Sequence, residues 1–462
     1  MKRLPTVLTI AGSDPSGGAG IQADLKTIAA HELAGLSVIT SLTVQNTQAV
    51  QERHDVAPEV VAAQLASLLA DGKPAAVKTG MLGNDRLVAT VARMLRRARV
   101  RNLVVDPVIR PTRGRALLSR EGVRVLQEKL LPLATVVTPN LREAEALSGV
   151  KIRKKADRAR AARALVKKGA RAVLITGGHG RGRAEDLFYD GKKLVTLDAP
   201  RLGQEALHGT GCVLSAAIAS NLALGASLPE AVEEAKEFIS EAIDLGVRTG
   251  AGAGQVQPLG GLYRDAERWL LLERMHQVVE FLKVQPIGEL IPEVQSNMGF
   301  ALEAARGPED VAAVPGRILR DGEGIATLHE PRFGASRHVA RIVLTAMQAD
   351  PGMRAAMNIR FQQSILDACK RLGMTLGTFD RSREPKNVKQ FEGSSLEWGT
   401  HQAIRECGFV PDVIYDLGGQ GKEEMIRVLA RDVEELLIKI LKIHHAVVRS
   451  AARRERESWR KR

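Results

Sequence analysis

Aromatic side chains are scarce in this chain: phenylalanine, tryptophan and tyrosine together make up 3% of its 462 residues. Proteins that hold single-stranded nucleic acid usually stack the bases on aromatic rings, so this composition argues against that class of partner. Cysteine is also sparse. The three present, Cys212, Cys369 and Cys407, cannot build a disulfide framework and have no paired metal-ligand spacing. The sequence therefore leaves any metal ligands unknown.

Long apolar runs are missing as well. No stretch approaches the ~18–20 apolar residues of a membrane-spanning helix. The apolar run near the N-terminus meets Asp14 too early for a signal peptide. We therefore expect a cytoplasmic protein without a membrane partner.

Positive charge is what the chain has in excess. It carries 67 lysines and arginines against 53 acidic residues, which gives a net charge of +14. Such an excess suits anionic partners, either nucleic acid or phosphorylated small molecules, and the scarcity of aromatic rings favours the small molecules. We interpret the basic tail at 445–462 as a solvated helix end.

The first half of the chain alternates short β-rich runs with amphipathic helical stretches such as 60–70 and 156–169. This alternation predicts an α/β domain with a mostly parallel sheet that helices cover on both faces. An Asp190-Gly191 pair between two strand-like runs predicts a hairpin. The expected strands are 7–12, 37–45, 76–80, 102–108, 135–140 and 172–178.

A glycine-rich stretch at 246–261 ends this first unit, and a new amphipathic helix follows at 267–284. The remainder reads as mixed α and β, with strand candidates at 355–361 and 411–419. We expect an α/β domain at 1–262, a mixed α/β domain at 267–444 and the basic tail at 445–462.

Two glycine-rich loops in the first unit point to phosphate chemistry. The loop at 11–20 follows a strand, and its glycines allow a ligand to approach the main chain. The loop at 208–212 precedes an apolar helix, whose N-terminal N–H groups form an anion site. Cys212 lies in the first turn of that helix, where the helix dipole is expected to lower the pKa of its thiol. The alternative, a small buried apolar residue, stays open on local sequence alone.

Together these motifs resemble the hydroxymethylpyrimidine/phosphomethylpyrimidine kinases, a thiamine-pathway family of the ribokinase-like superfamily. The resemblance covers the whole first unit, and the motifs follow the family's order. It implies a ribokinase-like fold and a kinase that uses ATP and Mg²⁺ to phosphorylate the pyrimidine alcohol and then its monophosphate. The matching motifs are AGSDPSGGAGIQADLKT (11–27), SLTVQNTQ (41–48), KTGML (78–82), TPNLREAEAL (138–147), TGGH (176–179) and HGTGC (208–212).

The resemblance also implies substrate contacts. Gln45 would hydrogen-bond the aminopyrimidine edge, because an amide can both donate and accept there. Asp24 and the backbone of Gly12 would hold the hydroxymethyl group, and Met81 would pack on the ring. Cys212 occupies the position where sugar-kinase relatives place a general-base aspartate, so it is the candidate for activating the attacking hydroxyl.

The implied phosphate and ATP contacts come from three segments: Gly209, Thr210, Gly211, Asn140, Glu143 and Asp106. The residues themselves allow simpler interpretations. Asp24 and Glu143 could be helix first-turn charges, and Asn140 could be an N-cap. Two departures from the family pattern, Thr176 and the segment 112–114, affect the details of ATP contact but not the type of reaction.

In the second unit, Arg337, His338 and Arg341 lie within one helical turn after a Gly-Ala-Ser sequence. Cations at the start of a helix oppose its dipole, so an anionic ligand there would relieve them. Solvent-exposed arginines and a capped histidine are the plain alternative.

The second unit resembles the archaeal-type thiamine-phosphate synthase domain. The resemblance implies condensation of the pyrimidine diphosphate with thiazole phosphate, with release of pyrophosphate. Arg317 and His338 are the implied catalytic residues, because they can neutralise the leaving diphosphate; Arg337, Arg341 and Lys422 are weaker phosphate candidates. Relatives often carry glycine where this chain has Gln295. The matching segments are 291–302, 310–318, 333–341, 357–361 and 421–425.

Two further hypotheses remain. The second unit could be a module that senses thiamine phosphates without catalysis, and the kinase could also accept pyridoxal-type substrates. No helix-turn-helix unit of the kind that accompanies such sensors is visible in the sequence. We expect small-molecule substrates as the partners, and a homo-oligomer.

Overall fold

The computed structural model describes residues 4–110, 117–177, 183–199, 207–385, 394–419 and 421–461. The chain divides into two compact units, Met1–Tyr263 and Arg264–Arg462. The division falls inside helix α9 (Gly260–Lys283), which begins before the helix expected at 267–284. Among the described residues no helix is both long and apolar enough to cross a membrane.

The first unit is built on a nine-stranded sheet of order β3-β2-β1-β4-β5-β6-β7-β8-β9. The strands from β2 to β7 in this order pair in parallel, whereas β3, β8 and β9 are antiparallel to their neighbours. The expected α/β class and the hairpin at Asp190-Gly191 are confirmed. The strands are β1 (Thr6–Ser13), β2 (Ala34–Gln45), β3 (Val50–Asp55), β4 (Ala76–Thr79), β5 (Leu103–Val105), β6 (Val136–Val137), β7 (Val173–Ile175), β8 (Ala184–Tyr189) and β9 (Leu194–Ala199).

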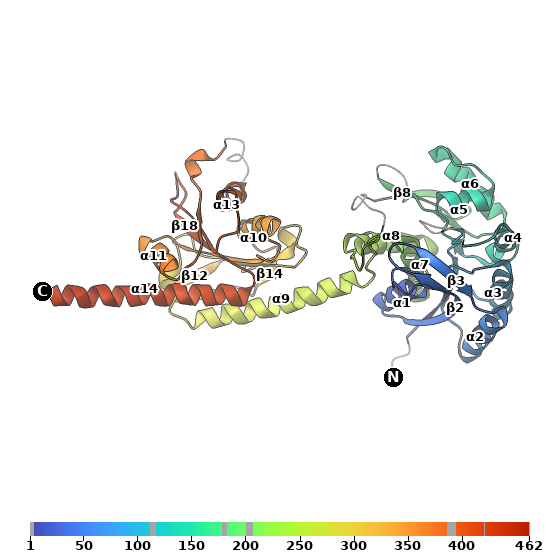
Figure 1. Cartoon of the computed structure of the whole chain (residues 1–462), viewed down its shortest axis with the longest axis horizontal. Coiled ribbons are helices and arrows are strands. Elements are labelled where there is room, and N and C mark those ends of the chain that lie inside the picture. The colour runs from blue at the N-terminus through green and yellow to red at the C-terminus, as the bar shows by residue number, and fades with distance from the viewer. Residues whose placement is uncertain are drawn as a thin grey trace. The chain divides into compact units, whose positions relative to one another are not determined.

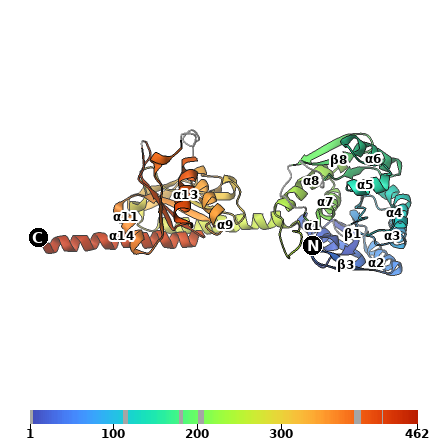
Figure 2. The ribbon, with the colours of Figure 1, turned by 45° about the horizontal axis from the view of Figure 1, so that its top comes forward.

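Helices cover both faces of this sheet (Figure 1, Figure 2). On one face, α1 (Gly20–Ala30), α7 (Thr210–Leu224) and α8 (Leu228–Asp244) enclose one apolar cluster. The other face carries a second cluster under five helices. The central strands are therefore buried on both sides, which explains why β4, β5 and β7 are buried at every position. The five helices are α2 (Pro58–Asp71), α3 (Asp85–Ala98), α4 (Arg120–Val125), α5 (Leu141–Ser148) and α6 (Lys155–Lys167).

The second unit contains a seven-stranded mixed sheet of order β14-β11-β10-β15-β18-β17-β16 and a separate two-stranded sheet, β12-β13. Within the larger sheet only β16 and β17 pair in parallel. The strands are β10 (Met298–Ala301), β11 (Val311–Ala313), β12 (Ile318–Asp321), β13 (Gly324–Thr327), β14 (Arg332–Phe333), β15 (Ala355–Arg360), β16 (Leu376–Thr378), β17 (Val413–Asp416) and β18 (Met425–Ala430).

Strand register in the larger sheet gathers several loops at one edge. The pairs Gly299↔Ala313, Arg360↔Met425 and Asp416↔Met425 place the ends of β11, β15 and β17 beside the starts of β10 and β18. Because β16 runs parallel to β17, it ends at the same edge. We call this the Asp416 edge.

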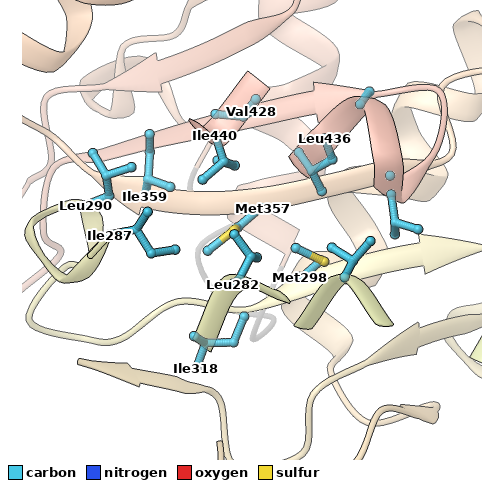
Figure 3. Packing of buried hydrophobic residues seen from close by; sticks show 14 of the residues in the cluster. Leu282, Ile287, Leu290, Met298, Ile318, Met357, Ile359, Val428, Leu436 and Ile440 are labelled. Carbon is cyan, nitrogen blue, oxygen red and sulfur yellow. The ribbon is translucent and has the colours of Figure 1, made fainter. Parts of the chain in front are cut away.

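Helices α10 (Arg337–Ala349) and α13 (Ser394–Cys407) pack on one face of that sheet. The other face packs against α9, α11 (Gln363–Arg371) and α14 (Val433–Lys461). Figure 3 shows this second core, where Leu282 of α9 and Leu436 and Ile440 of α14 surround Met357 of β15. Helix α14 runs on through the basic stretch at 445–461.

Candidate active sites

The two glycine-rich loops of the first unit are locked together. Asp14 in the first loop is 3% exposed, and its Oδ2 lies 3.0 Å from Nε2 of His208, which opens the second loop. Gly209 has a φ of +89°, and a Cβ there would lie 1.8 Å from the carbonyl oxygen of Gly18. Only glycine satisfies both constraints, so the second loop depends on Gly209 for its place against the first.

Helix α7 turns its N-terminus toward this junction. Gly209 is its N-cap, and among the described residues no side-chain cap hydrogen bond occurs there. The hydroxyl of Thr210 donates back to the Leu207 carbonyl at 2.9 Å, so the backbone rather than this hydroxyl is available to a ligand. Gly211 is exposed, and a Cβ there would lie 3.9 Å from Oδ2 of Asp106. Uncapped N–H groups at the positive end of a helix favour an anion.

The residues expected to hold the pyrimidine lie at the carboxyl ends of neighbouring strands. Gln45 ends β2, and its Nε2 lies 3.1 Å from Nε2 of His208. Gly12 lies near the end of β1, and a Cβ there would lie 2.3 Å from Cε of Met81, just beyond β4. The carboxyl ends of parallel strands are where open α/β sheets bind ligands. The structure thus brings Gln45, Gly12 and Met81 to the same edge of the sheet.

Beneath this edge lies a buried ion pair that the sequence did not single out. Lys78 of β4 is fully buried, and its Nζ donates to both carboxylate oxygens of Asp24 at 2.8 Å. The Thr9 hydroxyl donates to the same carboxylate at 2.5 Å. Burial lowers the pKa of Lys78, but the neighbouring Asp24, Cys212 and Asp106 outweigh it and raise that pKa above its ordinary value.

The carboxylate of Asp24 is therefore enclosed by protein groups and is fully buried. It lies beyond the first turn of α1, so the simpler interpretation as a first-turn charge is wrong. Burial raises the pKa of Asp24, although Lys78 and Thr9 act against this shift. Its expected contact with a substrate hydroxyl stays a prediction. The signal that could have revealed Lys78 is a charged lysine inside the short predicted strand that contains AVKT.

Cys212 lies next to this charge cluster. The expectation that the helix dipole lowers the pKa of its thiol is wrong: burial raises that pKa to about 12, and the charges of Asp106 and Asp24 add to the rise. The Lys78 charge and the Gly20 N–H lower it, but they do not prevail. The side chain is half-buried and also packs against the apolar cluster beneath α7. The thiol is thus protonated at neutral pH in this state of the protein.

Asp106 and Glu143 are two buried carboxyl groups that influence each other. Burial raises the pKa of Asp106 to about 6, with Lys78 opposing the shift. Burial and the charge of Asp106 raise the pKa of Glu143 to about 8. Glu143 accepts hydrogen bonds from the backbone N–H of Asn140 at 3.0 Å and of Ile109 at 3.2 Å.

Asn140 is the N-cap of α5 and forms a capping box with Glu143, so the N-cap interpretation and the first-turn interpretation of Glu143 are both confirmed. These roles fix the positions of the two side chains without excluding a ligand contact. Thr176, one of the departures noted above, forms a bridge with Asn140. The other departure, Thr112, Arg113 and Gly114, lies outside the described residues, as do Gly178 and His179 of the TGGH motif.

We expect Lys78→Met to destabilise the first unit strongly, because it leaves the Asp24 carboxylate buried without its cation. Removing one partner of a buried ion pair costs about 3–5 kcal/mol. Chemical denaturation of the full chain should show the loss in the transition of the first unit. Lys155→Met is the matched control, since Lys155 forms an exposed pair with Glu185 and should cost no more than about 1 kcal/mol. Equal losses for the two variants would contradict this account.

In the second unit, Arg317 lies on the loop that follows β11, at the Asp416 edge. Its φ is +74°, its side chain is exposed, and it donates a hydrogen bond to the carbonyl of Val294. Gln295 has a φ of +68°, which explains why glycine suits this position in relatives. Here the Gln295 side chain accepts a hydrogen bond from the Arg320 N–H at 2.9 Å. This bond offsets part of the cost of the positive φ at Gln295.

His338 and Arg337 are exposed at the start of α10, and Arg341 is half-buried one turn later. In the described part of the chain no hydrogen bond joins Arg317 to His338. The N–H of Gly334, just before α10, donates a hydrogen bond to the carbonyl of Val311, the first residue of β11. Arg317, in contrast, follows Ala313, the last residue of β11. A joint contact of Arg317 and His338 with one diphosphate stays a prediction.

Lys422 belongs to a polar cluster at the Asp416 edge. Its Nζ donates to the Ser395 hydroxyl at 2.8 Å and lies 3.7 Å from a carboxylate oxygen of Glu384. Asp416, fully buried, accepts hydrogen bonds from Arg381 and from Arg427, the latter at 2.8 Å. Sequence reasoning proposed Lys422 but missed its acidic and basic neighbours. Gln420 of the same loop lies outside the described residues.

One possible metal-binding group occurs among the residues that the structure describes. His276, Glu280 and Glu330 place one ligand atom each within 4.8 Å of one another. The two carboxylates are exposed, and Glu280 already pairs with Lys283. We attach no function to this group.

Comparisons with known proteins divide the chain in the same way. The family described as phosphomethylpyrimidine kinase matches residues 14–257. The family described as thiamine-phosphate synthase ThiN matches residues 274–442. Each match therefore falls largely within one of the two compact units.

Two relatives show how the matches combine. The hydroxymethylpyrimidine/phosphomethylpyrimidine kinase of Rhizobium meliloti is 50% identical over 250 residues, which cover 54% of this chain and 94% of that protein. The bifunctional thiamine biosynthesis protein ThiDN of Methanocaldococcus jannaschii is 32% identical over 440 residues, or 94% of this chain and 97% of that one.

Solved structures resemble the first unit. The ADP complex of Bacillus subtilis pyridoxal kinase matches with a TM-score of 0.53 at 35% identity, and covers 56% of this chain and 99% of that chain. The Staphylococcus aureus pyridoxal kinase in complex with AMP-PCP and pyridoxal matches with a TM-score of 0.51 at 36% identity, over 55% of this chain and 94% of that one. Each match therefore covers nearly the whole length of a known kinase.

Proposed function

We propose a residue-level mechanism for this chain from the premise that it belongs to the family of bifunctional ThiDN proteins of thiamine biosynthesis. It is an enzyme with an N-terminal hydroxymethylpyrimidine/phosphomethylpyrimidine kinase domain and a C-terminal thiamine-phosphate synthase domain. The observation that carries this conclusion is the match to ThiDN across both units. We further propose that the enzyme acts in the cytoplasm as a homo-oligomer on small-molecule substrates.

In the kinase, the aminopyrimidine binds at the edge formed by Gln45, Gly12 and Met81. The amide of Gln45 pairs with the ring edge, and Met81 covers the ring face beside Gly12. This arrangement points the hydroxymethyl group toward Cys212 and the start of α7. Cys212 takes the hydroxyl proton as the oxygen attacks the γ-phosphate of ATP. The N–H groups of Gly209, Thr210 and Gly211 stabilise the transferring phosphoryl group.

The raised pKa of Cys212 is the main obstacle to its role as a base. Bringing a cationic or strongly hydrogen-bonding group near the sulfur would favour the thiolate. Lys78 already lowers the pKa of this thiol. A protonated thiol cannot accept a further proton. In our mechanism Cys212 therefore first loses its own proton to solvent and then, as the thiolate, takes the hydroxyl proton during phosphoryl transfer.

ATP is the phosphoryl donor and Mg²⁺ its partner in this proposal. Related kinases have been crystallised with ADP or AMP-PCP. The donor set fits Mg²⁺: Asp106 and Glu143 are two oxygen-bearing side chains, buried and close enough for the charge of Asp106 to raise the pKa of Glu143. They would hold the ion near the first turn of α7, where Gly211 lies close to Asp106. When bound, Mg²⁺ neutralises charge on the phosphate oxygens.

Binding of the Mg²⁺–nucleotide complex at pH 7 should release protons. With a pKa of about 8 in the free protein, Glu143 is largely protonated at that pH and must ionise to bind a cation. Release should fall as the pH rises through about 8 and be largely lost at about 9, where Glu143 is already ionised. Calorimetric titrations in two buffers of different ionisation enthalpy measure the number of protons released on binding. Glu143→Gln should suppress the release, and an unchanged release in that variant would contradict the assignment.

In the second unit, the C–O bond between the pyrimidine methylene and the diphosphate breaks, and the thiazole nitrogen bonds to that methylene. The electron pair of the broken bond leaves with the pyrophosphate. Arg317 and His338 neutralise this leaving group. Arg337, Arg341 and Lys422 are further phosphate contacts. A role as a non-catalytic sensor of thiamine phosphates is the outcome that the synthase assay must exclude.

A second activity of the kinase is favoured by its structural neighbours. Both solved structures described above are pyridoxal kinases at 35–36% identity. We therefore propose that the first unit also phosphorylates pyridoxal-type alcohols, more slowly than the pyrimidine.

The test is the product mass after the purified chain is incubated with hydroxymethylpyrimidine, thiazole phosphate, ATP and Mg²⁺. We expect thiamine phosphate. Formation of pyrimidine diphosphate without thiamine phosphate would support the kinase assignment and favour the sensor role for the second unit. A parallel incubation with pyridoxal tests the second activity, and absence of pyridoxal phosphate would reject it.

A further inference from the structure

The polar cluster at the Asp416 edge contains a buried carboxylate, that of Glu384, one oxygen of which has no partner in the described part of the chain. The Glu384 side chain is 2% exposed. Its Oε2 lies 3.7 Å from Nζ of Lys422, which is longer than a hydrogen bond, and its Oε1 has no hydrogen-bond partner among the residues that the structure describes. A buried acceptor without a donor costs free energy. The orphaned oxygen therefore marks a place where a ligand N–H would be stabilising.

The position of Glu384 in the fold supports a ligand site. Glu384 follows β16, and Asp416 ends the parallel neighbour β17. The connection from β16 to β17 includes α13, and Ser395 in its first turn contacts Lys422. Ligands of βαβ units bind at the carboxyl ends of the parallel strands, where the helix N-terminus adds positive potential. Glu384 and Lys422 both lie at this end.

Hydrogen bonds connect this cluster to the loop after β11 that carries Arg317. Arg317 donates to the carbonyl of Val294. The N–H of Val294 in turn donates to Glu423 at 3.1 Å, and Glu423 is the immediate neighbour of Lys422. A ligand that reaches from Glu384 past Lys422 toward Arg317 would thus meet first an acceptor and then two cations.

We propose that Glu384 accepts a hydrogen bond from the exocyclic amino group of the aminopyrimidine diphosphate in the second unit, while Lys422 and Arg317 face its phosphates. This inference rests on the proposed synthase function and deepens it. The aminopyrimidine diphosphate offers the required pattern, an N–H donor at one end and anionic oxygens at the other. Asp416 takes no part in binding, because Arg381, Arg427 and the Gly418 N–H already satisfy its oxygens.

The experiment compares two inhibitors of the condensation, assayed without ATP so that the kinase is idle. One is the aminopyrimidine monophosphate, and the other is the same compound with hydrogen in place of the amino group. Charge-assisted hydrogen bonds predict that the wild-type chain binds the amino compound roughly 30- to 100-fold more tightly. Glu384→Ala should raise the inhibition constant of the amino compound by that factor and leave the other within about threefold. Glu384→Gln, which keeps an acceptor oxygen, should fall between them.

Glu397→Ala is the matched control, because Glu397 is an exposed glutamate in the first turn of α13. It should change neither inhibition constant. An equal rise for both compounds in Glu384→Ala would assign Glu384 a structural role and overturn the proposal, as would no change for either.

Calorimetric titration with the aminopyrimidine monophosphate separates this inference from the synthase assignment. We expect two binding sites per chain, one in each unit, and loss of one site in Glu384→Ala. If the wild-type chain does not condense its substrates but Glu384→Ala still loses a site, the synthase function fails and the binding site stands. Two retained sites in the variant would overturn the binding site whatever the synthase assay gives.

Discussion

Replacing Cys212 with alanine should lower the turnover of both phosphorylation steps by roughly 10²- to 10⁴-fold, the range expected for loss of a general base. The KM for ATP should change little, because the N–H groups at the start of α7 and the pair Asp106 and Glu143 stay in place. Steady-state kinetics with hydroxymethylpyrimidine, and separately with its monophosphate, measure the two quantities.

The raised pKa of Cys212 means that this prediction requires a thiolate that is scarce in the free protein. With a pKa of about 12, only a small fraction of this thiol is thiolate at neutral pH in the free protein, and only the thiolate can accept the hydroxyl proton. Turnover should rise with pH across the neutral range in the wild-type chain and lose this dependence in the variant. Cys407→Ala, a half-buried cysteine of the second unit, is the control. Near-normal turnover of Cys212→Ala would reduce Cys212 to packing against the apolar cluster under α7.

Alanine at Arg317 or at His338 should lower the condensation rate at least ~10²–10³-fold while both phosphorylations proceed normally. Loss of a single group that stabilises developing negative charge has effects of this size. Product formation from purified pyrimidine diphosphate and thiazole phosphate measures the condensation, and an ATP-dependent assay on the same preparation measures the kinase.

Two surface variants serve as controls for this pair. Arg320→Ala removes an exposed arginine near Arg317 in sequence, and His445→Ala removes an exposed histidine of α14. Both should condense normally. If Arg317→Ala and His338→Ala also lost the kinase activity, the cause would be misfolding rather than catalysis. If one of them condensed at the normal rate, that residue would leave the proposed mechanism, which matters because no hydrogen bond joins the two in the described chain.

The fold class follows from patterns that are visible in the sequence. Parallel strands buried on both faces read as short apolar runs. Strands β5 and β7 lie within the predicted runs, and β1 extends one residue beyond its predicted run at each end. The hairpin between β8 and β9 was marked by Asp190-Gly191, and Gly191 has the positive φ that such a turn needs. The start of α9 was harder to place, because its first residues belong to the glycine-rich stretch that reads as a loop.

The site was only partly legible because burial and pairing are long-range properties. Lys78 and Asp24 are far apart in the chain, and only the fold shows that they neutralise each other. The helix position of Cys212 predicted a lowered pKa, but burial, together with the charges of Asp106 and Asp24, raises the pKa instead. Glu384 gave no signal in the sequence, since its missing partner is visible only once the surrounding loops are placed.

The pair Lys78 and Asp24 also constrains how this enzyme can change over generations. Either residue replaced alone leaves a charge in the interior, at a cost comparable to a large share of a domain's total stability. Replacing both with apolar side chains of matching volume is often neutral. The two positions should therefore vary together or not at all, and a laboratory selection that introduces one substitution at a time should seldom pass through either intermediate. A library that randomises both codons at once opens that route.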